Sequence, residues 1–300
     1  MYLEKIQSPE DVKKLDVEQL KVLAGEMRQA LIQKLSVHGG HVGPNLGMVE
    51  ATIAMHYVFD SPKDKMVFDV SHQSYCHKML TGRVDAFLDE AKYDDVSGYS
   101  EPSESAHDFF CIGHTSTSVS LACGLAKARD LADENYNVIA VIGDGSLSGG
   151  EALEGLDFAK ELNGNLIVVV NDNEMSIAEN HGGLYENLKL LRDTKGQAEC
   201  NIFKAMGLNY VFVEDGNDLT QLIDAFKRVK DSKAPVAVHI HTLKGKGYTL
   251  AEENKESWHW HMPFDIETGK TKGNYDGGED YGTLTADYLL QKMKEDASVV

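Results

Sequence analysis

An acidic residue and a carboxamide follow two apolar runs at a spacing that suits a metal-bound phosphate. Val138–Ile142 is an uninterrupted apolar run that predicts a buried strand, and Gly143-Asp144-Gly145-Ser146 comes directly after it. A second run, Asn165–Val170, leads to Asn173, which lies 29 residues beyond Asp144. Glycines allow close backbone approach to a phosphate, and a helix start favours its negative charge. Carboxylate and amide oxygens suit Mg²⁺, so the pattern predicts a magnesium–diphosphate site.

An incidental strand-turn-helix is the alternative, because many α/β proteins contain a Gly-Asp-Gly without special function. The context favours the site, since the helix expected from Gly149 onward would join the two strands into one β-α-β unit. Asp144 and Asn173 would then lie at the same carboxyl edge of a parallel sheet, where ligands of open α/β folds bind.

Further apolar segments extend this unit into an α/β fold, with a parallel sheet flanked by helices on both faces. In addition to the two strands above, buried strands are expected over residues 65–70, 210–213 and 236–240. Apolar residues at helical spacing predict helices over residues 16–35, 46–57, 119–131, 199–206 and 218–230. Asp16 is the expected cap of the first of these helices.

The composition is that of an acidic chain long enough for a large core. Its 300 residues include 29 Lys plus Arg and 48 Asp plus Glu, which give a net charge of −19. Such a chain is a poor candidate for binding nucleic acid or a membrane surface, although a metal still permits a phosphorylated ligand. It shows no apolar run of membrane-spanning length and no signal-peptide layout at its start. With four cysteines outside any metal-site spacing, we expect a soluble cytoplasmic protein.

Four histidines fall in predicted loops rather than on helix faces, and these are His41, His72, His114 and His259. Each one alone is better explained without a function, as a hydrogen-bonded core residue or as a solvated loop residue. Together they suit proton transfer near neutral pH, because loops on a rigid scaffold carry catalytic groups. Zinc binding competes with this interpretation, but the usual zinc-ligand spacing is absent.

Two further turns are candidate phosphate contacts. Gly113-His114-Thr115 opens a helix of small residues, so its N–H groups and hydroxyl could face an anion. An ordinary Ser/Thr helix cap is the alternative for that turn. Lys244 to Tyr248 follows the last expected strand, and its lysines either contact phosphate or belong to a solvated turn.

The chain changes character after residue 244. We expect a diphosphate-binding domain over residues 1–244 and a functional loop and linker over 245–280, where glycine, asparagine and aromatic residues replace helical periodicity. Residues 281–295 predict an amphipathic helix, and residues 298–300 resemble the first part of another strand. A chain that stops on entering a strand is expected to be a piece of a longer protein or to have a separate polypeptide as its partner.

Ordered stretches along nearly the whole chain resemble the 1-deoxy-D-xylulose-5-phosphate synthase family of the transketolase superfamily. Gly-Asp-Gly followed by Asn173 resembles the thiamine-diphosphate motif of the superfamily. The stretches that narrow the match to the synthase family are Gly39–Gly47, Asp69–Arg83, Gly113–Ser118, Asn171–Ile177, Trp258-His259 and Pro263–Gly269. Such long ordered matches are far more specific than the Gly-Asp-Gly alone.

The resemblance implies a thiamine-diphosphate-binding fold and a role for each matching residue. Asp144 and Asn173 would hold Mg²⁺, together with the main-chain carbonyl of Met175. His41 and His259 would handle protons on the donor substrate and on the reaction intermediate. The other cofactor contacts that the resemblance implies are His72, Gly113, His114, Thr115, Gly145, Ser146 and Tyr248.

The resemblance also implies an activity, the condensation of pyruvate with glyceraldehyde 3-phosphate with release of CO₂. Three departures bear on the substrates. Glu101-Pro102 stands where the family usually has Lys-Arg, Ser71 replaces a usual glycine, and Gly149–Glu151 is closer to transketolases. Ketol transfer between sugar phosphates is therefore the alternative activity. A non-catalytic paralogue that acts as an assembly partner is a further alternative, against which the intact metal and histidine positions argue.

The family pattern also implies that part of the active site belongs to a second domain. The glutamate that activates the cofactor's aminopyrimidine, and the arginines that bind the acceptor's phosphate, belong to a pyrimidine-binding domain beyond residue 300. Residues 281–300 resemble the start of that domain. We therefore expect a truncated longer chain that is catalytically incomplete alone, and a homodimer in the complete enzyme.

Overall fold

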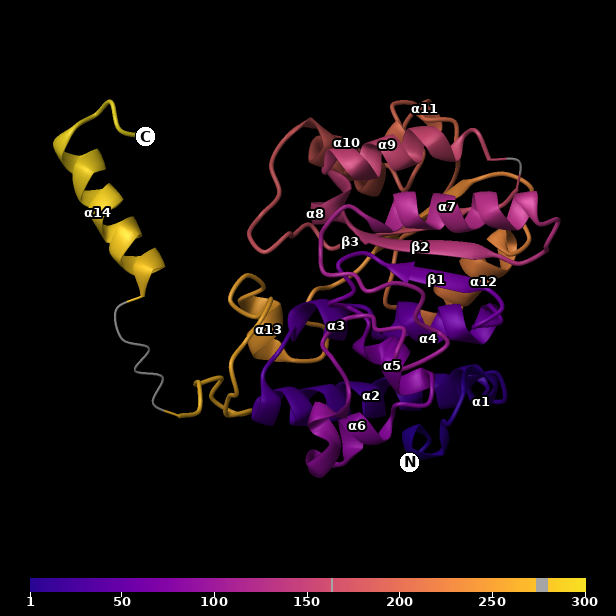
Figure 1. The fold of residues 1–300 in the computed structure, drawn as a ribbon, viewed down its shortest axis with the longest axis horizontal. Helices are drawn as coiled ribbons and strands as arrows, with labels where there is room; N and C mark the ends of the chain where they lie inside the picture. The colour runs from indigo at the N-terminus through magenta and orange to yellow at the C-terminus, as the bar shows by residue number, and fades with distance from the viewer. Residues whose placement is uncertain (163, 274–279) are drawn as a thin grey trace.

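The computed structural model describes residues 1–162, 164–273 and 280–300. Its centre is a five-stranded sheet in the order β1-β2-β3-β5-β4, with every neighbouring pair parallel (Figure 1). The strands are β1 (Lys65–Phe68), β2 (Val138–Gly143), β3 (Ile167–Asp172), β4 (Asn209–Val213) and β5 (Val236–His241). The fold class and the positions of all five strands agree with the sequence prediction.

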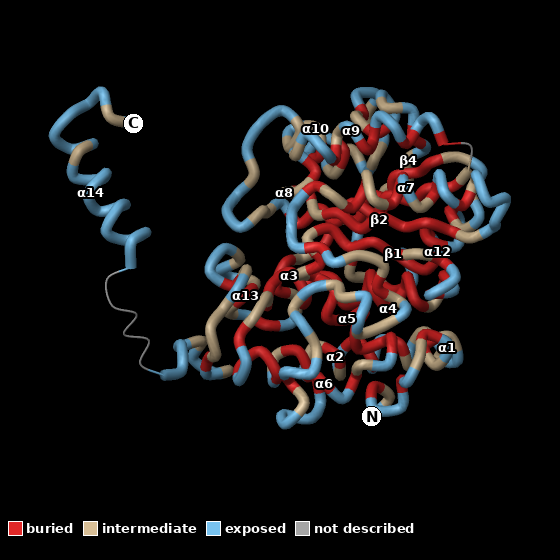
Figure 2. Tube along the Cα trace, in the orientation of Figure 1, coloured by how far each residue is buried: buried red, intermediate tan, exposed pale blue. Residues whose placement is uncertain are grey.

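Helices cover both faces of the sheet, and alternate residues of each strand supply the two cores. Ile139 and Val141 of β2 join one core, whereas Ala140 and Ile142 join the other. The helices that contribute to the first core are α1 (Pro9–Val12), α2 (Val17–His38), α3 (Gly43–Gly47), α4 (Val49–Val58), α5 (Tyr75–Leu80), α6 (Asp85–Leu88), α12 (Leu219–Val229) and α13 (Thr249–Glu253). Those of the second core are α7 (Ser118–Leu131), α8 (Asp144–Leu147), α9 (Gly150–Ala159), α10 (Gly183–Asp193) and α11 (Ile202–Ala205). Strands β1, β2, β3 and β5 are buried along almost their whole length, whereas the edge strand β4 is mostly half-buried (Figure 2).

Several helices differ from the prediction for local reasons. The helix expected over residues 46–57 is two helices, α3 and α4, because the backbone leaves the helical region at Met48. The helix expected over 199–206 begins only after Asn201, whose side chain accepts the N–H groups of Phe203 and Lys204 and so caps α11. The sequence analysis did not predict α10, which lies on the second face of the sheet and bears on the site below.

The segment expected to be a loop and linker, residues 245–280, is only partly irregular. It contains α13, and Trp258 and Phe264 are buried in the first core, so residues 245–273 pack on the body of the molecule. The prediction for residues 274–279 lies outside the described residues.

Helix α14 (Tyr281–Glu295) forms as predicted but buries none of its residues, and it stands apart from the body (Figures 1 and 2). The expected strand at residues 298–300 is absent from the described chain end, which turns back through a hydrogen bond from the Val299 N–H to the Asp296 carbonyl. A strand needs a pairing neighbour, and none of the five sheet strands reaches this end.

The remaining expectations from composition concern thiols and membranes. All four cysteines are free, with Cys76 and Cys123 buried and Cys111 and Cys200 exposed. Over the residues that the structure describes, no helix combines the length and the apolar character that a membrane span requires.

Candidate functional site

The predicted metal ligands meet at the carboxyl edge of the sheet. Strand β2 ends at Gly143, which pairs with Asn171 of β3, so Asp144 and Asn173 both continue from neighbouring strand ends. Both residues line one pocket of about 330 Å³, together with Met175. Gly145 is required at this edge because a Cβ there would overlap the side chain of Ser176 from the next loop. The loop after β3 thus lies directly against the Gly-Asp-Gly turn.

Asp144 is a buried carboxyl of this pocket. Its side chain is 1% exposed, and its Oδ2 accepts a hydrogen bond of 2.9 Å from Asn180 Nδ2. Burial raises the pKa of Asp144 well above its ordinary value, and the neighbouring Asp172 carboxylate raises it further. Asn173 Oδ1 accepts the Met175 N–H at 3.2 Å, which orders the loop that carries the Met175 carbonyl. These groups form a set of hard oxygen donors.

Asp172 connects β3 with β5 and α10 at this edge, a role that was not predicted from the sequence. Its Oδ2 accepts His239 Nε2 at 2.8 Å and the Arg192 guanidinium at 2.5 Å, so β5 and α10 are both tied to the end of β3. Burial alone would raise the pKa of Asp172, but the His239 and Arg192 contacts lower it to about 2. A charged Asp172 carboxylate beside Asp144 favours the binding of a cation at this edge. The available signal was the acidic residue within Asn-Asp-Asn at a strand end.

Most of the sequence-predicted site residues share the pocket, and three do not. Those that line it are His41, His72, Thr115, Asp144, Gly145, Ser146, Asn173, Met175 and His259. Gly113 and His114 lie exposed in the turn before α7, where His114 Nδ1 contacts the Thr115 carbonyl at 2.8 Å. Tyr248 is buried outside the lining, and its hydroxyl donates to the Ile266 carbonyl at 2.8 Å.

The start of α7 is occupied by a protein carboxylate. Asp69, at the end of β1, accepts the N–H groups of Ser116 and Ser118 at 2.8 and 2.9 Å. The Ser/Thr cap is not formed, because Thr117 at the cap position makes no capping hydrogen bond and Asp69 accepts the N–H groups instead. Thr115 still lines the pocket. This role of Asp69 was not predicted, because the expected strand over residues 65–70 included Asp69, whereas β1 ends at Phe68.

The position of Lys244 decides between the two interpretations of its turn, a lysine of the site or a lysine exposed to solvent. The side chain is buried and lines the pocket, and its Nζ donates to the Ser176 carbonyl at 2.7 Å. Burial lowers the pKa of Lys244 to about 8, while the nearby Asp144 carboxyl acts in the opposite direction. The lysine therefore belongs to the site rather than to a solvated turn, and it holds the loop that follows Asn173.

Three histidines from distant parts of the chain line the pocket and lie close together. The ring centroids of His41 and His72 lie 4.9 Å apart, and His259 lies 5.6 Å from the first and 5.4 Å from the second. His259 reaches this position because its loop pairs with the His41 loop, through two hydrogen bonds of 2.9 Å between Gly40 and His261. The structure thus brings together the two histidines that the resemblance implies for proton transfer.

Burial keeps these imidazoles neutral. It lowers the pKa of His41 to about 4 and that of His259 to about 4, with Lys244 and His41 adding to the effect on His259. The pKa of His72 is lowered well below its ordinary value, again chiefly by burial. A neutral imidazole can accept a proton from a substrate hydroxyl, which a permanently charged one cannot.

These lowered pKa values predict an acid-sensitive fold. A histidine with a lower pKa in the folded than in the unfolded state stabilises the fold fully above pH 6.5, and this stability is lost as the pH falls toward 4. Each contributes at most about 1.4 kcal/mol per pH unit in that window, less for partly exposed rings. Urea unfolding at pH 7.5, 6.0 and 5.0 should show this slope, and it should be smaller in His41→Gln with His259→Gln. An equal slope in the double variant, referenced to its own stability at pH 7.5, would contradict the assignment.

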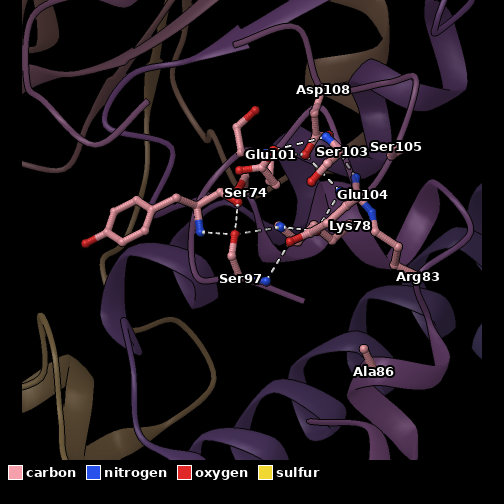
Figure 3. Close-up of polar contacts among 12 residues, drawn as sticks. Ser74, Lys78, Arg83, Ala86, Ser97, Glu101, Ser103, Glu104, Ser105 and Asp108 are labelled. Carbon is pink, nitrogen blue, oxygen red and sulfur yellow. Dashed lines mark hydrogen bonds and ion pairs between the residues drawn. The ribbon is translucent and has the colours of Figure 1, made fainter. Parts of the chain in front are cut away.

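Residues 97–108 form a wall beside His41 that is held by buried ion pairs (Figure 3). Lys78 Nζ lies 2.5 Å from Glu104 Oε2, and Glu104 Oε1 accepts the N–H of Ser97 at 2.6 Å. Tyr99, two residues further on, places its ring edge-to-face with His41 at a centroid distance of 6.0 Å. The ion pairs therefore fix the stretch that borders the catalytic histidine candidate.

One departure from the family pattern, Glu101-Pro102, lies in this wall, and a second, Ser71, contacts it. Glu101, in place of a usual lysine, accepts the N–H of Ser103 at 3.0 Å and does not line the pocket. Ser71 has φ +67°, a conformation that glycine adopts without strain. Its hydroxyl donates to the Ile112 carbonyl at 2.9 Å and accepts the Ser100 N–H at 2.8 Å. Two hydrogen bonds to the wall thus offset the strain of a serine at this position.

Known proteins are similar to this chain over nearly its whole length. The family model described as 1-deoxy-D-xylulose-5-phosphate synthase matches residues 3–200 and 192–242. The 1-deoxy-D-xylulose-5-phosphate synthase of Caldanaerobacter subterraneus subsp. tengcongensis is 41% identical over 334 residues, which cover 99% of this chain and 53% of that protein. A synthase of Geobacter sulfurreducens is also 41% identical, over 99% of this chain and 52% of its own length. The chain spans about half the length of these relatives.

Solved transketolases share the fold at lower sequence identity. The enzyme of Campylobacter jejuni superimposes with a TM-score of 0.64 at 19% identity, over 81% of this chain and 40% of that one. That of Leishmania mexicana gives a TM-score of 0.63 at 18% identity, over 95% of this chain and 48% of that one. The structural likeness establishes the fold, and the sequence matches establish the closer relationship: the chain belongs to the 1-deoxy-D-xylulose-5-phosphate synthase family.

Proposed function

We propose that this chain provides the diphosphate- and Mg²⁺-anchoring part of a thiamine-diphosphate-dependent transferase. The complete enzyme would condense pyruvate with glyceraldehyde 3-phosphate and release CO₂. The observation that carries the proposal is one pocket that is lined both by Asp144, Asn173 and Met175 and by three closely spaced histidines. Membership of the synthase family supports the choice of cofactor and substrates.

The residues present fit the proposed cofactor and metal. Asp144 is a buried carboxyl beside a second carboxylate, an arrangement that a divalent cation would stabilise. Between the described residues there is no cluster of three His, Cys, Asp or Glu side chains for a metal, so the donor set must include amide and main-chain oxygens. Nδ1 of both His72 and His259 is buried without a hydrogen-bond partner, although both residues line the pocket. Buried polar atoms without partners are uncommon, and a bound ligand would satisfy them.

Each residue then has a defined task in the proposal. Asp144, Asn173 and the Met175 carbonyl would hold Mg²⁺, and Gly145 and Ser146 would line the diphosphate. When bound, thiamine diphosphate would supply the carbanion chemistry that side chains cannot perform.

Proton transfer falls to the histidines in the same proposal. His41 and His259, kept neutral by burial, would accept and return protons at the oxygen atoms of the donor substrate. His72 and Thr115 would contact the cofactor from the pocket wall. Tyr99 lies edge-to-face against the His41 ring and would help to hold that ring in place.

The domain organisation is part of the proposal. Residues 1–244 would form the diphosphate-binding domain, residues 245–280 a functional loop and linker, and 281–300 the start of a pyrimidine-binding domain. The apolar side chains that α14 exposes support this last point, because a helix of a packed domain would cover them. They are Tyr281, Leu284, Tyr288, Leu289, Leu290 and Met293. The complete enzyme would be a cytoplasmic homodimer.

An assay of the complete enzyme that contains this chain tests the reaction. With Mg²⁺, thiamine diphosphate and pyruvate labelled at its carboxyl carbon, we expect release of labelled CO₂ that depends on glyceraldehyde 3-phosphate. The transketolase fold of the structural neighbours supports one other candidate, ketol transfer between sugar phosphates. Transfer from a ketose phosphate without CO₂ release from pyruvate would favour that candidate and reject the synthase. Omission of Mg²⁺ is the control for both assays.

A further inference from the structure

Asn45 is a fully buried carboxamide that connects two loops of the site. It lies on α3, and its side chain is 0% exposed. Its Nδ2 donates to the main-chain carbonyl of His41 at 2.8 Å and to that of His72 at 2.8 Å. Its Oδ1 accepts the N–H of Tyr75, the first residue of α5, at 3.0 Å. One side chain therefore binds both histidine loops and the helix that follows the second.

The chemistry of the partners fixes the orientation of this carboxamide. Two main-chain carbonyls can only accept and the Tyr75 N–H can only donate, so only one placement of the amide nitrogen and oxygen satisfies all three. A carboxylate would lack both donors, and an apolar side chain would leave three buried main-chain groups without partners. Asparagine is thus the residue of this size that the position needs.

The three Asn45 contacts bear on the distance between the His41 and His72 rings. His41 and His72 are 31 residues apart in the chain, yet their ring centroids lie 4.9 Å apart. A further polar contact between the two loops, from the His41 N–H to the Tyr75 hydroxyl, is 3.5 Å long and correspondingly weaker. The Asn45 contacts are the short ones, and they act on the backbone at both histidines rather than on the rings.

We propose that Asn45 is a positioning residue that sets the distance between His41 and His72. The consequence for cofactor affinity rests on the proposed function, whereas the consequence for ring geometry does not. Removing the carboxamide would free both carbonyls, and the two loops would relax independently. The rings would then separate, although neither histidine has been altered.

Histidine-labelled NMR of the full chain tests the proposal with Asn45→Ala. A matched control is Asn137→Ala, which removes an equally buried carboxamide just before β2, at the opposite end of the sheet. We expect the ring signals of both His41 and His72 to shift, and their mutual ring–ring contact to be lost, in Asn45→Ala only. The Kd of thiamine diphosphate with Mg²⁺, measured by calorimetry, should rise at least tenfold in Asn45→Ala and less than threefold in the control.

Unchanged His41 and His72 signals in Asn45→Ala would overturn the proposal. If Asn45→Ala does not fold, Asn45→Asp keeps the shape of the side chain, lacks the two donors and is read in the same way. If the unaltered chain does not bind thiamine diphosphate, the proposed function fails, and the ring signals still decide the role of Asn45. If the unaltered chain binds it and both variants lose affinity equally, the loss is one of stability and the positioning role is rejected.

Discussion

Replacing Asp144 with alanine is expected to abolish Mg²⁺-dependent binding of thiamine diphosphate to this chain. Asp144 provides the carboxylate of the proposed donor set, and Asn173 and the Met175 carbonyl contribute no formal charge to it. Because loss of a residue that merely orients a metal ligand costs about 10- to 100-fold in affinity, loss of the ligand itself should cost about 100-fold or more. Calorimetric titration with thiamine diphosphate, in Mg²⁺ and then in a chelator, measures the effect.

Asp64→Ala is the matched control for this experiment. Asp64 is also buried, but it accepts the N–H of Asn137 at 2.7 Å at the amino end of the sheet, far along the strands from the pocket. The control should be less stable while its Mg²⁺-dependent affinity is retained. Retained affinity in Asp144→Ala would instead mean that the Gly-Asp-Gly turn is not the metal site.

The stability of the chain measured without metal distinguishes a role of Asp144 in metal binding from a role in folding. The pKa of Asp144 is higher in the folded chain than in the unfolded chain, so its ionisation destabilises the fold as the pH rises above the unfolded value of 3.8. Asp144→Asn removes that charge and retains an acceptor for Asn180. In the absence of metal this variant should therefore be at least as stable as the unaltered chain at pH 7. A large loss of stability would show that Asp144 is needed for folding.

The sheet and the meeting of Asp144 and Asn173 at one of its edges were predictable from the sequence because their signals are local. Each strand is an uninterrupted apolar run, and parallel strands joined by a helix must end at the same edge of the sheet. Asp144 and Asn173 therefore had one possible meeting place once the strands were recognised. The end of the first strand likewise predicted the position of His72, which follows that strand.

The supporting contacts were not predictable, because they depend on pairs that are distant in the sequence. Arg192 contacts Asp172 from a helix whose apolar spacing was not recognised, and His239 lies within a strand where it looked like any buried residue. Asn45 makes its three contacts across gaps of up to 30 residues. A sequence pattern shows which residues can form hydrogen bonds, whereas the fold decides which partners they meet.

Asp108→Ala is expected to destabilise the chain by about 3–5 kcal/mol, the range found when one partner of a buried ion pair is removed. The Asp108 side chain is 1% exposed, and its carboxylate accepts Arg83 at 2.8 and 2.9 Å, His77 at 3.1 Å and the N–H of Glu101 at 2.9 Å (Figure 3). Burial alone would raise the pKa of Asp108, but the His77 and Arg83 contacts hold it far below its ordinary value. Urea unfolding at pH 7 gives the loss of free energy.

Two comparisons decide whether the uncompensated charge is the cause. Asp193→Ala removes a carboxylate from an exposed pair with Lys189, one helical turn apart, and should cost less than about 0.5 kcal/mol. Arg83→Met combined with Asp108→Ala removes both charges, so it should be more stable than Asp108→Ala alone. If the double variant is instead less stable by the sum of both losses, packing rather than charge holds the wall. Because this wall places Tyr99 beside His41, Asp108→Ala should also shift the ring signals of His41, whereas Asp193→Ala should not.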